Sequence, residues 1–204
     1  MTRPETVVVA TGTANLASVS AALERLGQRV RLVDRPSEVL AAERVVLPGV
    51  GSLSAAMERL EGLELAPALR ERIAQGLPTL AICLGLQLLA EASEESPGVR
   101  GLAAFEGRVE ELRGDVRLPH LGWNRVEVDD SCELLRSGYA CFANGYALPR
   151  APRGWSAATC SHGSAFVAAL ERGPVLACQF HPELSGAYGS ALLGRWLERG
   201  GASC

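Results

Sequence analysis

Short apolar runs alternate with helical patterns over the first part of the chain. Runs rich in β-branched residues at 7–10, 30–33, 45–47 and 79–82 predict buried parallel strands. Residues 15–26 and 66–75 carry apolar side chains at helical spacing. This alternation predicts an α/β fold with a mostly parallel, doubly wound sheet flanked by helices, which binds ligands at the carboxyl ends of its strands.

The second half of the chain has a different pattern. Apolar runs at 105–112, 123–128, 139–143, 155–160, 166–170 and 175–180 are separated by glycine and proline, which predicts antiparallel or mixed strands added to the sheet. Residues 187–198 predict a closing amphipathic helix, and the polar stretch 91–98 predicts a surface loop. Because no repeat or low-complexity linker divides the chain, we expect residues 1–204 to form one domain.

Composition excludes several kinds of chemistry. The chain has no lysine, since all 20 basic residues are arginine, and this excludes a Schiff-base enzyme and a Walker-type phosphate loop. Six cysteines without a Cys-x-x-Cys pair give no support to a zinc, redox or disulfide motif, so we expect neither metal nor cofactor. The net charge of −3 favours neither nucleic acid nor membrane. With no apolar run of spanning length and no signal-peptide pattern, we expect a cytoplasmic protein.

Cys83 is the strongest candidate for a nucleophile. The apolar strand predicted at 79–82 runs directly into Cys83, and Gly85 follows at the start of a helical pattern. This is the thiol counterpart of the strained strand-to-helix turn that presents the serine of many hydrolases. A helix N-terminus favours the thiolate, and the amide of Leu84 can help to stabilise a tetrahedral oxyanion.

His181 is the histidine best placed to serve Cys83, because it ends a convincing buried strand. Residues 181 and 183 of an extended chain project to the same side, so Glu183 can accept a hydrogen bond from the imidazole and fix its tautomer. These residues predict a Cys-His-acid triad. His120, at a turn-rich strand start, and His162, in a segment of hairpin composition, are interpreted as structural.

Two glycines follow the third predicted strand, at the end where ligands bind. Gly49 and Gly51 allow the backbone to approach a ligand closely and to point amides at a developing negative charge. Their position beside Cys83 makes this segment a candidate for the oxyanion side of the site.

Together these residues resemble a class I, triad-type glutamine amidotransferase and, within that family, the glutaminase subunits of imidazole glycerol phosphate synthases. The cysteine and His-x-Glu blocks are typical of the superfamily, whereas Pro-His-Leu-Gly-Trp-Asn together with Pro-Gly-Val-Gly is typical of this branch. The resemblance covers nearly the whole chain and rests on Gly12 and on residues 15–16, 48–51, 82–87, 119–124 and 179–183.

The resemblance implies a role for each matching residue. Cys83 would attack the side-chain amide of glutamine, His181 would protonate the departing ammonia, and Glu183 would orient His181. The substrate-binding residues implied are Gly49, Gly51, Leu84, Gln87, Gly145 and Tyr146.

The resemblance also implies a partner. Ammonia would pass to a (β/α)8-barrel cyclase subunit in a heterodimer, which would consume a phosphoribulosyl-formimino ribotide and release imidazole glycerol phosphate and aminoimidazole carboxamide ribotide. The residues implied to lie toward this partner are Asn15, Pro119, Trp123 and Asn124.

Several positions depart from the family pattern, and none of them is a triad residue. Ala81 stands where the turn usually begins with glycine, so its methyl group must find room. Asn144 and Gly145 stand where a His-Ser pair is common, which leaves the backbone of Gly145 and Tyr146 to hold glutamine. Leu184 replaces a frequent lysine, so an interface ion pair there is expected to be missing.

Three other functions are compatible with parts of this pattern. The chain could serve another synthase, for anthranilate or pyridoxal phosphate, but the specific turn blocks argue against that. A free-standing cysteine hydrolase of γ-glutamyl compounds would be fully active alone, whereas a synthase subunit would be nearly idle without its partner. A binding-only module would not need Cys83, His181 and Glu183 intact.

Overall fold

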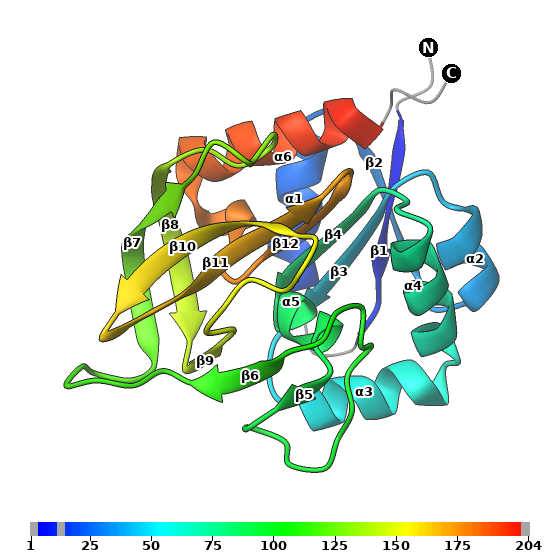
Figure 1. The fold of residues 1–204 in the computed structure, drawn as a ribbon. Coiled ribbons are helices and arrows are strands. Elements are labelled where there is room, and N and C mark those ends of the chain that lie inside the picture. Colours follow the sequence, from blue (N-terminus) through cyan, green and yellow to red (C-terminus); the bar gives the residue numbers. More distant parts are fainter. Residues whose placement is uncertain (1–3, 12–14, 201–204) are drawn as a thin grey trace.

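The structure is a computed structural model and describes residues 4–11 and 15–200. Within these ranges a nine-stranded sheet has the strand order β2-β1-β3-β4-β12-β11-β10-β7-β8 (Figure 1). The first five strands in this order are parallel, and each later strand is antiparallel to the one before it. The strands are β1 (Glu5–Val9), β2 (Arg29–Val33), β3 (Val45–Gly49), β4 (Thr79–Cys83), β7 (His120–Val128), β8 (Gly138–Asn144), β10 (Ser156–His162), β11 (Ser164–Arg172) and β12 (Val175–Cys178). The predicted α/β sheet with added antiparallel strands is confirmed.

Helices cover both faces of the parallel strands (Figure 1). Because side chains alternate across a strand, Val7 and Val9 of β1 pack in one hydrophobic cluster and Val8 packs in the other. No helix among the described residues is long and apolar enough to cross a membrane. On one face lie α1 (Leu16–Arg25) and α6 (Gly186–Gly200); on the other lie α2 (Pro36–Ala41), α3 (Leu53–Gly62), α4 (Leu65–Ala74) and α5 (Leu84–Leu89).

The prediction of a surface loop at 91–98 is wrong in part. Ser93 and Ser96 are buried, and the Ser96 hydroxyl accepts a hydrogen bond from the amide of Ser54 at 3.2 Å, at the start of α3. Part of the stretch also belongs to a small second sheet, with the order β5-β6-β9. Its strands are β5 (Ala92–Ser93), β6 (Arg108–Glu111) and β9 (Tyr146–Ala147).

One edge of the large sheet gathers most of the candidate residues. The strand directions place the carboxyl ends of β1, β3, β4, β8, β10 and β12 at this edge, together with the beginning of β7. We call it the carboxyl edge. Asn15, Gly49, Cys83, His120, Asn144 and His181 lie at or just beyond it.

A buried arginine holds the opposite end of β4. Arg72 of α4 is fully buried and has no carboxylate partner in the described part of the chain; its guanidinium donates instead to main-chain carbonyls and one hydroxyl. These contacts tie α2, α4 and the start of β4 together, so the strand that carries Cys83 is fixed at both ends. The acceptors are Val39, Ala42, Glu43, Pro78 and Thr79.

Candidate active site

Cys83 occupies a sharp turn between β4 and α5. Its φ of 55° and ψ of −109° lie in a region that residues with a side chain rarely adopt. Strand β4 is paired with β3 on one side and β12 on the other, so the sheet holds the strained residue in place. The structure therefore has the predicted strand-to-helix turn, with Leu84 as the first residue of α5.

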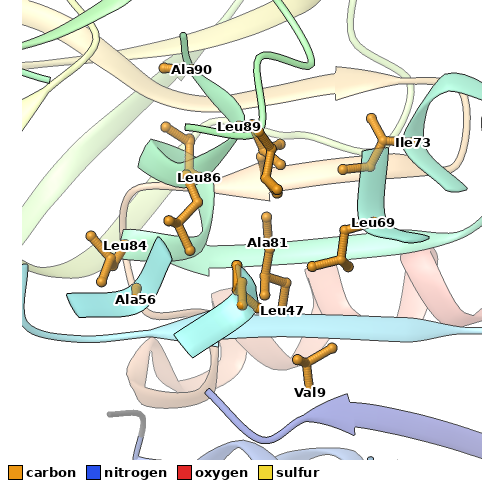
Figure 2. Close-up of a cluster of buried hydrophobic side chains, with 14 of the residues drawn as sticks. Val9, Leu47, Ala56, Leu69, Ile73, Ala81, Leu84, Leu86, Leu89 and Ala90 are labelled. Atoms are coloured by element: carbon orange, nitrogen blue, oxygen red, sulfur yellow. The ribbon is translucent and has the colours of Figure 1, made fainter. Parts of the chain in front are cut away.

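Small residues allow the turn to lie directly against β3. A Cβ added at Gly85 would lie 2.1 Å from the carbonyl oxygen of Leu47, and one at Gly49 would lie 3.0 Å from the Cβ of Leu84. Ala81 is fully buried, and its methyl group lies in the hydrophobic cluster that also contains Leu47 and Leu89 (Figure 2). The hydrophobic core beneath the turn thus accommodates the methyl group of Ala81, at a position where glycine is usual.

His181 and Glu183 form a buried hydrogen-bonded pair. The Nδ1 atom of His181 lies 2.8 Å from Oε1 of Glu183, and the two side chains are only 10% and 3% exposed. The contact agrees with the sequence prediction, but the geometric reason given for it is wrong. Residues Pro182–Leu184 form a 3-10 turn, η1, rather than an extended chain, and this turn brings the carboxylate back toward the imidazole.

The surroundings of His181 favour the protonated imidazole. Burial lowers its pKa, but the hydrogen bonds and charges of Cys83 and Glu183 outweigh burial and raise the pKa to about 10. The raised value implies that the ring is an imidazolium at neutral pH. Such a cation beside Cys83 stabilises a thiolate.

Removing the Cys83 thiol is expected to lower the pKa of His181. The Cys83→Ala variant loses two of the interactions that raise this pKa to about 10. Because the folded pKa lies above the value of about 6.5 in an unfolded chain, protonation of His181 stabilises the fold fully below pH 6.5. This stabilisation is lost as the pH rises toward the folded pKa, so in Cys83→Ala it disappears at a lower pH.

Two measurements check this expectation. Histidine NMR titration gives the pKa of each ring, and denaturant unfolding from pH 6 to pH 10 gives the free energy of unfolding. Cys132→Ala is the matched control, because the pKa of Cys132 is raised to about 11 by burial and by Glu171, and Cys132 is not among the causes of the His181 shift. An unchanged His181 titration in Cys83→Ala would show that the thiol does not interact with the imidazole.

A cavity of about 290 Å³ opens beside Cys83 and His181. Its volume is at the small end of the range for ligand pockets, which suits a ligand of amino-acid size. Of the predicted substrate-binding residues, only Gly49 does not line the cavity, because it packs beneath the turn instead. The other lining residues are Val50, Gly51, Leu84, Gln87, Glu95, Ala143, Asn144, Gly145 and Tyr146.

Two polar residues at this site were missed by the sequence analysis. Glu95 lines the cavity, and its Oε2 accepts a hydrogen bond from the amide of Leu53 at 3.1 Å. Gln179 is fully buried and its Nε2 lies 3.8 Å from the sulfur of Cys83. Gln179 directly precedes the Phe-His-Pro-Glu residues and could have been recognised there from the sequence. The polar stretch around Glu95 has no sequence pattern that marks a site residue.

An apolar surface adjoins the cavity on β7 and β8. Leu121, Trp123 and Tyr139 are 69%, 59% and 60% exposed. Their register places them on the same face of the two strands as Ala143, which lines the cavity. Pro119 is also exposed at the start of β7.

The other residues predicted to face a partner make contacts within the chain. The exposed Asn15 caps α1, because its Oδ1 accepts from the amide of Ser18 at 3.3 Å. Asn124 donates to the carbonyl of Ser161 at 2.9 Å. Gly12 lies outside the described residues.

His120 and His162 lie outside the cavity lining. Their rings stack with centroids 4.1 Å apart, and His120 also stacks on Phe142 at 4.8 Å. Burial and the neighbouring His162 lower the pKa of His120 to about 4. Both contacts fit the interpretation of these residues as structural.

Comparison with known proteins shows the family to which the chain is similar. Residues 7–197 match the family described as glutamine amidotransferase class-I. A protein named imidazole glycerol phosphate synthase subunit HisH from Thermosynechococcus vestitus is 42% identical over 201 residues, which is 95% of this chain and 96% of that protein. The chain belongs to the class-I glutamine amidotransferase family.

Two further comparisons concern a longer relative and a solved structure. Imidazole glycerol phosphate synthase hisHF, chloroplastic, from Arabidopsis thaliana is 38% identical over 91% of this chain, although the match covers only 33% of that longer protein. A solved structure described as a glutamine amidotransferase superposes with a TM-score of 0.77 and 23% identity, covering 96% of this chain and 98% of that one. The likeness to this structure confirms the amidotransferase fold.

Proposed function

We propose that this class-I glutamine amidotransferase is the glutaminase subunit of an imidazole glycerol phosphate synthase. It hydrolyses glutamine to glutamate and passes the ammonia to a cyclase subunit. The observation that carries the proposal is that Cys83 and His181 line one cavity on the carboxyl edge, while Glu183 is hydrogen-bonded to the far side of His181. The names of the full-length relatives, at about 40% identity, support the choice of synthase.

In the first half of the reaction the Cys83 thiolate attacks the side-chain amide carbon of glutamine. The carbonyl becomes an oxyanion, and the amides of Gly51 and Leu84 are the donors proposed to stabilise it. The carbon–nitrogen bond then breaks as the His181 imidazolium gives its proton to the leaving nitrogen. Ammonia departs, and a thioester links Cys83 to the glutamyl group.

In the second half water attacks the thioester. Neutral His181 accepts a proton from the attacking water, so the imidazolium is restored when the carbon–sulfur bond breaks and glutamate leaves with Cys83 again a thiolate. Glu183 holds Nδ1 of His181 by the 2.8 Å hydrogen bond, and its charge stabilises the imidazolium in each cycle.

The cavity offers groups that match the amino-acid end of glutamine. Glu95 supplies a carboxylate for the α-ammonium group, and Gln87 lies between the nucleophile and the wall at Tyr146. Asn144 donates through Nδ2 to the carbonyl of Tyr146 at 3.1 Å, while its buried Oδ1 has no hydrogen-bond partner among the described residues. Asn144 thereby fixes the wall that replaces the common His-Ser contacts.

The exposed apolar side chains of β7 and β8 support a protein partner. Leu121, Trp123 and Tyr139 form a patch that reaches the rim of the cavity, so a subunit seated on it would lie close to the site where ammonia forms. The longer Arabidopsis relative carries about two thirds of its length beyond the matched region. We propose a (β/α)8-barrel cyclase as the partner that covers this patch.

Partner-dependent glutaminase activity tests the proposal. We expect the chain alone to release glutamate slowly. Release should be at least about tenfold faster when the cyclase subunit and its nucleotide substrate are added, because their binding is expected to be coupled to the glutaminase site. Glutamate release and imidazole glycerol phosphate formation are measured together. Full activity without a partner would favour a free-standing hydrolase, and activation by another synthase would contradict the proposed pathway.

Two matched surface variants test the docking patch. Leu121→Arg places a charge within the patch and is expected to weaken co-purification with the cyclase by tenfold or more. Leu32→Arg is the control, since Leu32 is 51% exposed on β2, at the other end of the strand order. Equal loss of binding in both variants would mean that the patch is not the interface.

A further inference from the structure

We propose that Gln179 is a positioning residue for the nucleophile: its side-chain amide donates a hydrogen bond to the sulfur of Cys83, which favours the thiolate and holds it toward the cavity. This inference deepens the proposed function, because it concerns the same nucleophile. It rests on a hydrogen-bonded chain of buried side chains that connects the sulfur with the cavity wall.

Gln179 is held rigidly beside the sulfur. It directly follows β12, and its main-chain amide donates to the carbonyl of Ala168 at 2.8 Å, so the backbone continues the pairing with β11. Its side chain is fully buried, and Nε2 lies 3.8 Å from Sγ of Cys83. A donor in this position binds a thiolate more strongly than a neutral thiol, because hydrogen bonds to an ionised acceptor are the stronger ones.

The hydrogen-bond network determines which end of the Gln179 amide faces the sulfur. The carbonyl oxygen of Tyr146 can only accept, so Gln87, 2.9 Å from it, must present its NH2 group there. The same Nε2 of Gln87 lies 3.1 Å from the Gln179 side chain, which must therefore present its oxygen. The NH2 group of Gln179 is left to face Cys83. The reversed amide would set two donors against each other.

The network links two parts of the site that are distant in the sequence. It runs from the wall at Tyr146 through Gln87 and Gln179 to Cys83, and all of these polar contacts are buried or partly buried. A hydrogen bond made in a dry environment is stronger than one in water, and its loss leaves buried groups unpaired. Gln179 consequently couples the orientation of Gln87 to the state of the sulfur.

Gln179→Met tests the proposal with a side chain of similar length that has no donor. The rate of Cys83 alkylation by iodoacetamide is measured from pH 5.5 to 9.5 on the full chain, with the modified peptide quantified by mass spectrometry. We expect alkylation to be about tenfold slower at pH 7 and its midpoint to move to higher pH, because the thiolate loses a donor. In the complex with the cyclase, kcat for glutamine should fall by a similar factor while KM changes less.

Gln179→Glu provides an independent second variant. Its carboxylate still accepts from Gln87, but it sets an oxygen and a negative charge against the sulfur. We expect slower alkylation than in Gln179→Met. If Gln179→Met does not fold, this variant decides the outcome.

Gln28→Met is the matched control. Gln28 is another buried glutamine, 5% exposed, whose Oε1 accepts from the hydroxyl of Thr6 at 2.9 Å. This variant should lose stability while keeping the wild-type alkylation profile. A merely structural role for Gln179 would give the same pattern.

A folded Gln179 variant with the wild-type pH dependence of alkylation would overturn the proposal. Alkylation needs no glutamine, so this outcome is separate from a failure of the proposed function. If the wild-type complex did not hydrolyse glutamine but Gln179→Met still slowed alkylation, the positioning role would stand and the glutaminase assignment would fall.

Discussion

Replacing Cys83 with alanine is expected to reduce glutamine-dependent synthesis by the complex on the order of a thousandfold or more and to leave ammonia-dependent synthesis intact. The variant removes the atom that forms the thioester, and losing a nucleophile costs most of the rate that a triad provides. Added ammonia does not need that thioester, since it reaches the cyclase without glutamine hydrolysis. The two nitrogen sources therefore separate the chemical role of Cys83 from a structural one.

The measurement uses the purified complex and follows imidazole glycerol phosphate with glutamine or with an ammonium salt. Cys132→Ala is the control, because Cys132 is half-buried outside the cavity and burial raises the pKa of its thiol to about 11. Loss of both activities in Cys83→Ala would mean that Cys83 supports the fold. Retention of both would remove it from the mechanism.

Most of the parallel half of the fold could be predicted because β1, β3, β4 and β12 are largely buried on both faces, whereas the edge strand β2 is only partly buried. Thr79–Cys83 and Val45–Gly49 are buried along their whole length, which produces uninterrupted apolar runs. The two-residue strands β5 and β9 are too short to show any periodicity. Helix α3 does have a readable pattern, with Leu53, Ala56, Met57 and Leu60 at helical spacing after the capping Ser52, although no helix was expected there.

The turn at Cys83 and the contact between His181 and Glu183 could be predicted because strong local chemistry marks each of these parts. Cys83 stands at a strand-to-helix turn, and Glu183 lies two residues from His181. Glu95 could not be found in this way, because what places it at the cavity is a long-range contact with the start of α3. Tertiary contacts of this kind leave no pattern in a polar loop.

Substituting Gly85 with alanine is expected to cost about 3 kcal/mol or more of unfolding free energy and to lower glutaminase activity at least about a hundredfold. The new Cβ would lie 2.1 Å from the carbonyl oxygen of Leu47, which is main chain and belongs to a strand paired on both sides. The clash can be relieved only by moving the turn that holds Cys83. A displacement of about 1 Å at a nucleophile is enough for a loss of this size.

Gly194→Ala is the matched control for Gly85→Ala, because it makes the same change of residue in a helix where there is room for the new methyl group. Gly194 also lies in a helix, α6, but an added Cβ there would meet no atom of the other described residues within 4 Å. Alanine is favoured over glycine inside a helix by about 1 kcal/mol, so Gly194→Ala should stabilise the chain slightly and leave glutaminase activity unchanged. The same change of residue is thus expected to have opposite effects on stability at the two sites. Denaturant unfolding and glutamate release measure both effects, and a stable, active Gly85→Ala variant would show that the turn does not need its close contact with β3.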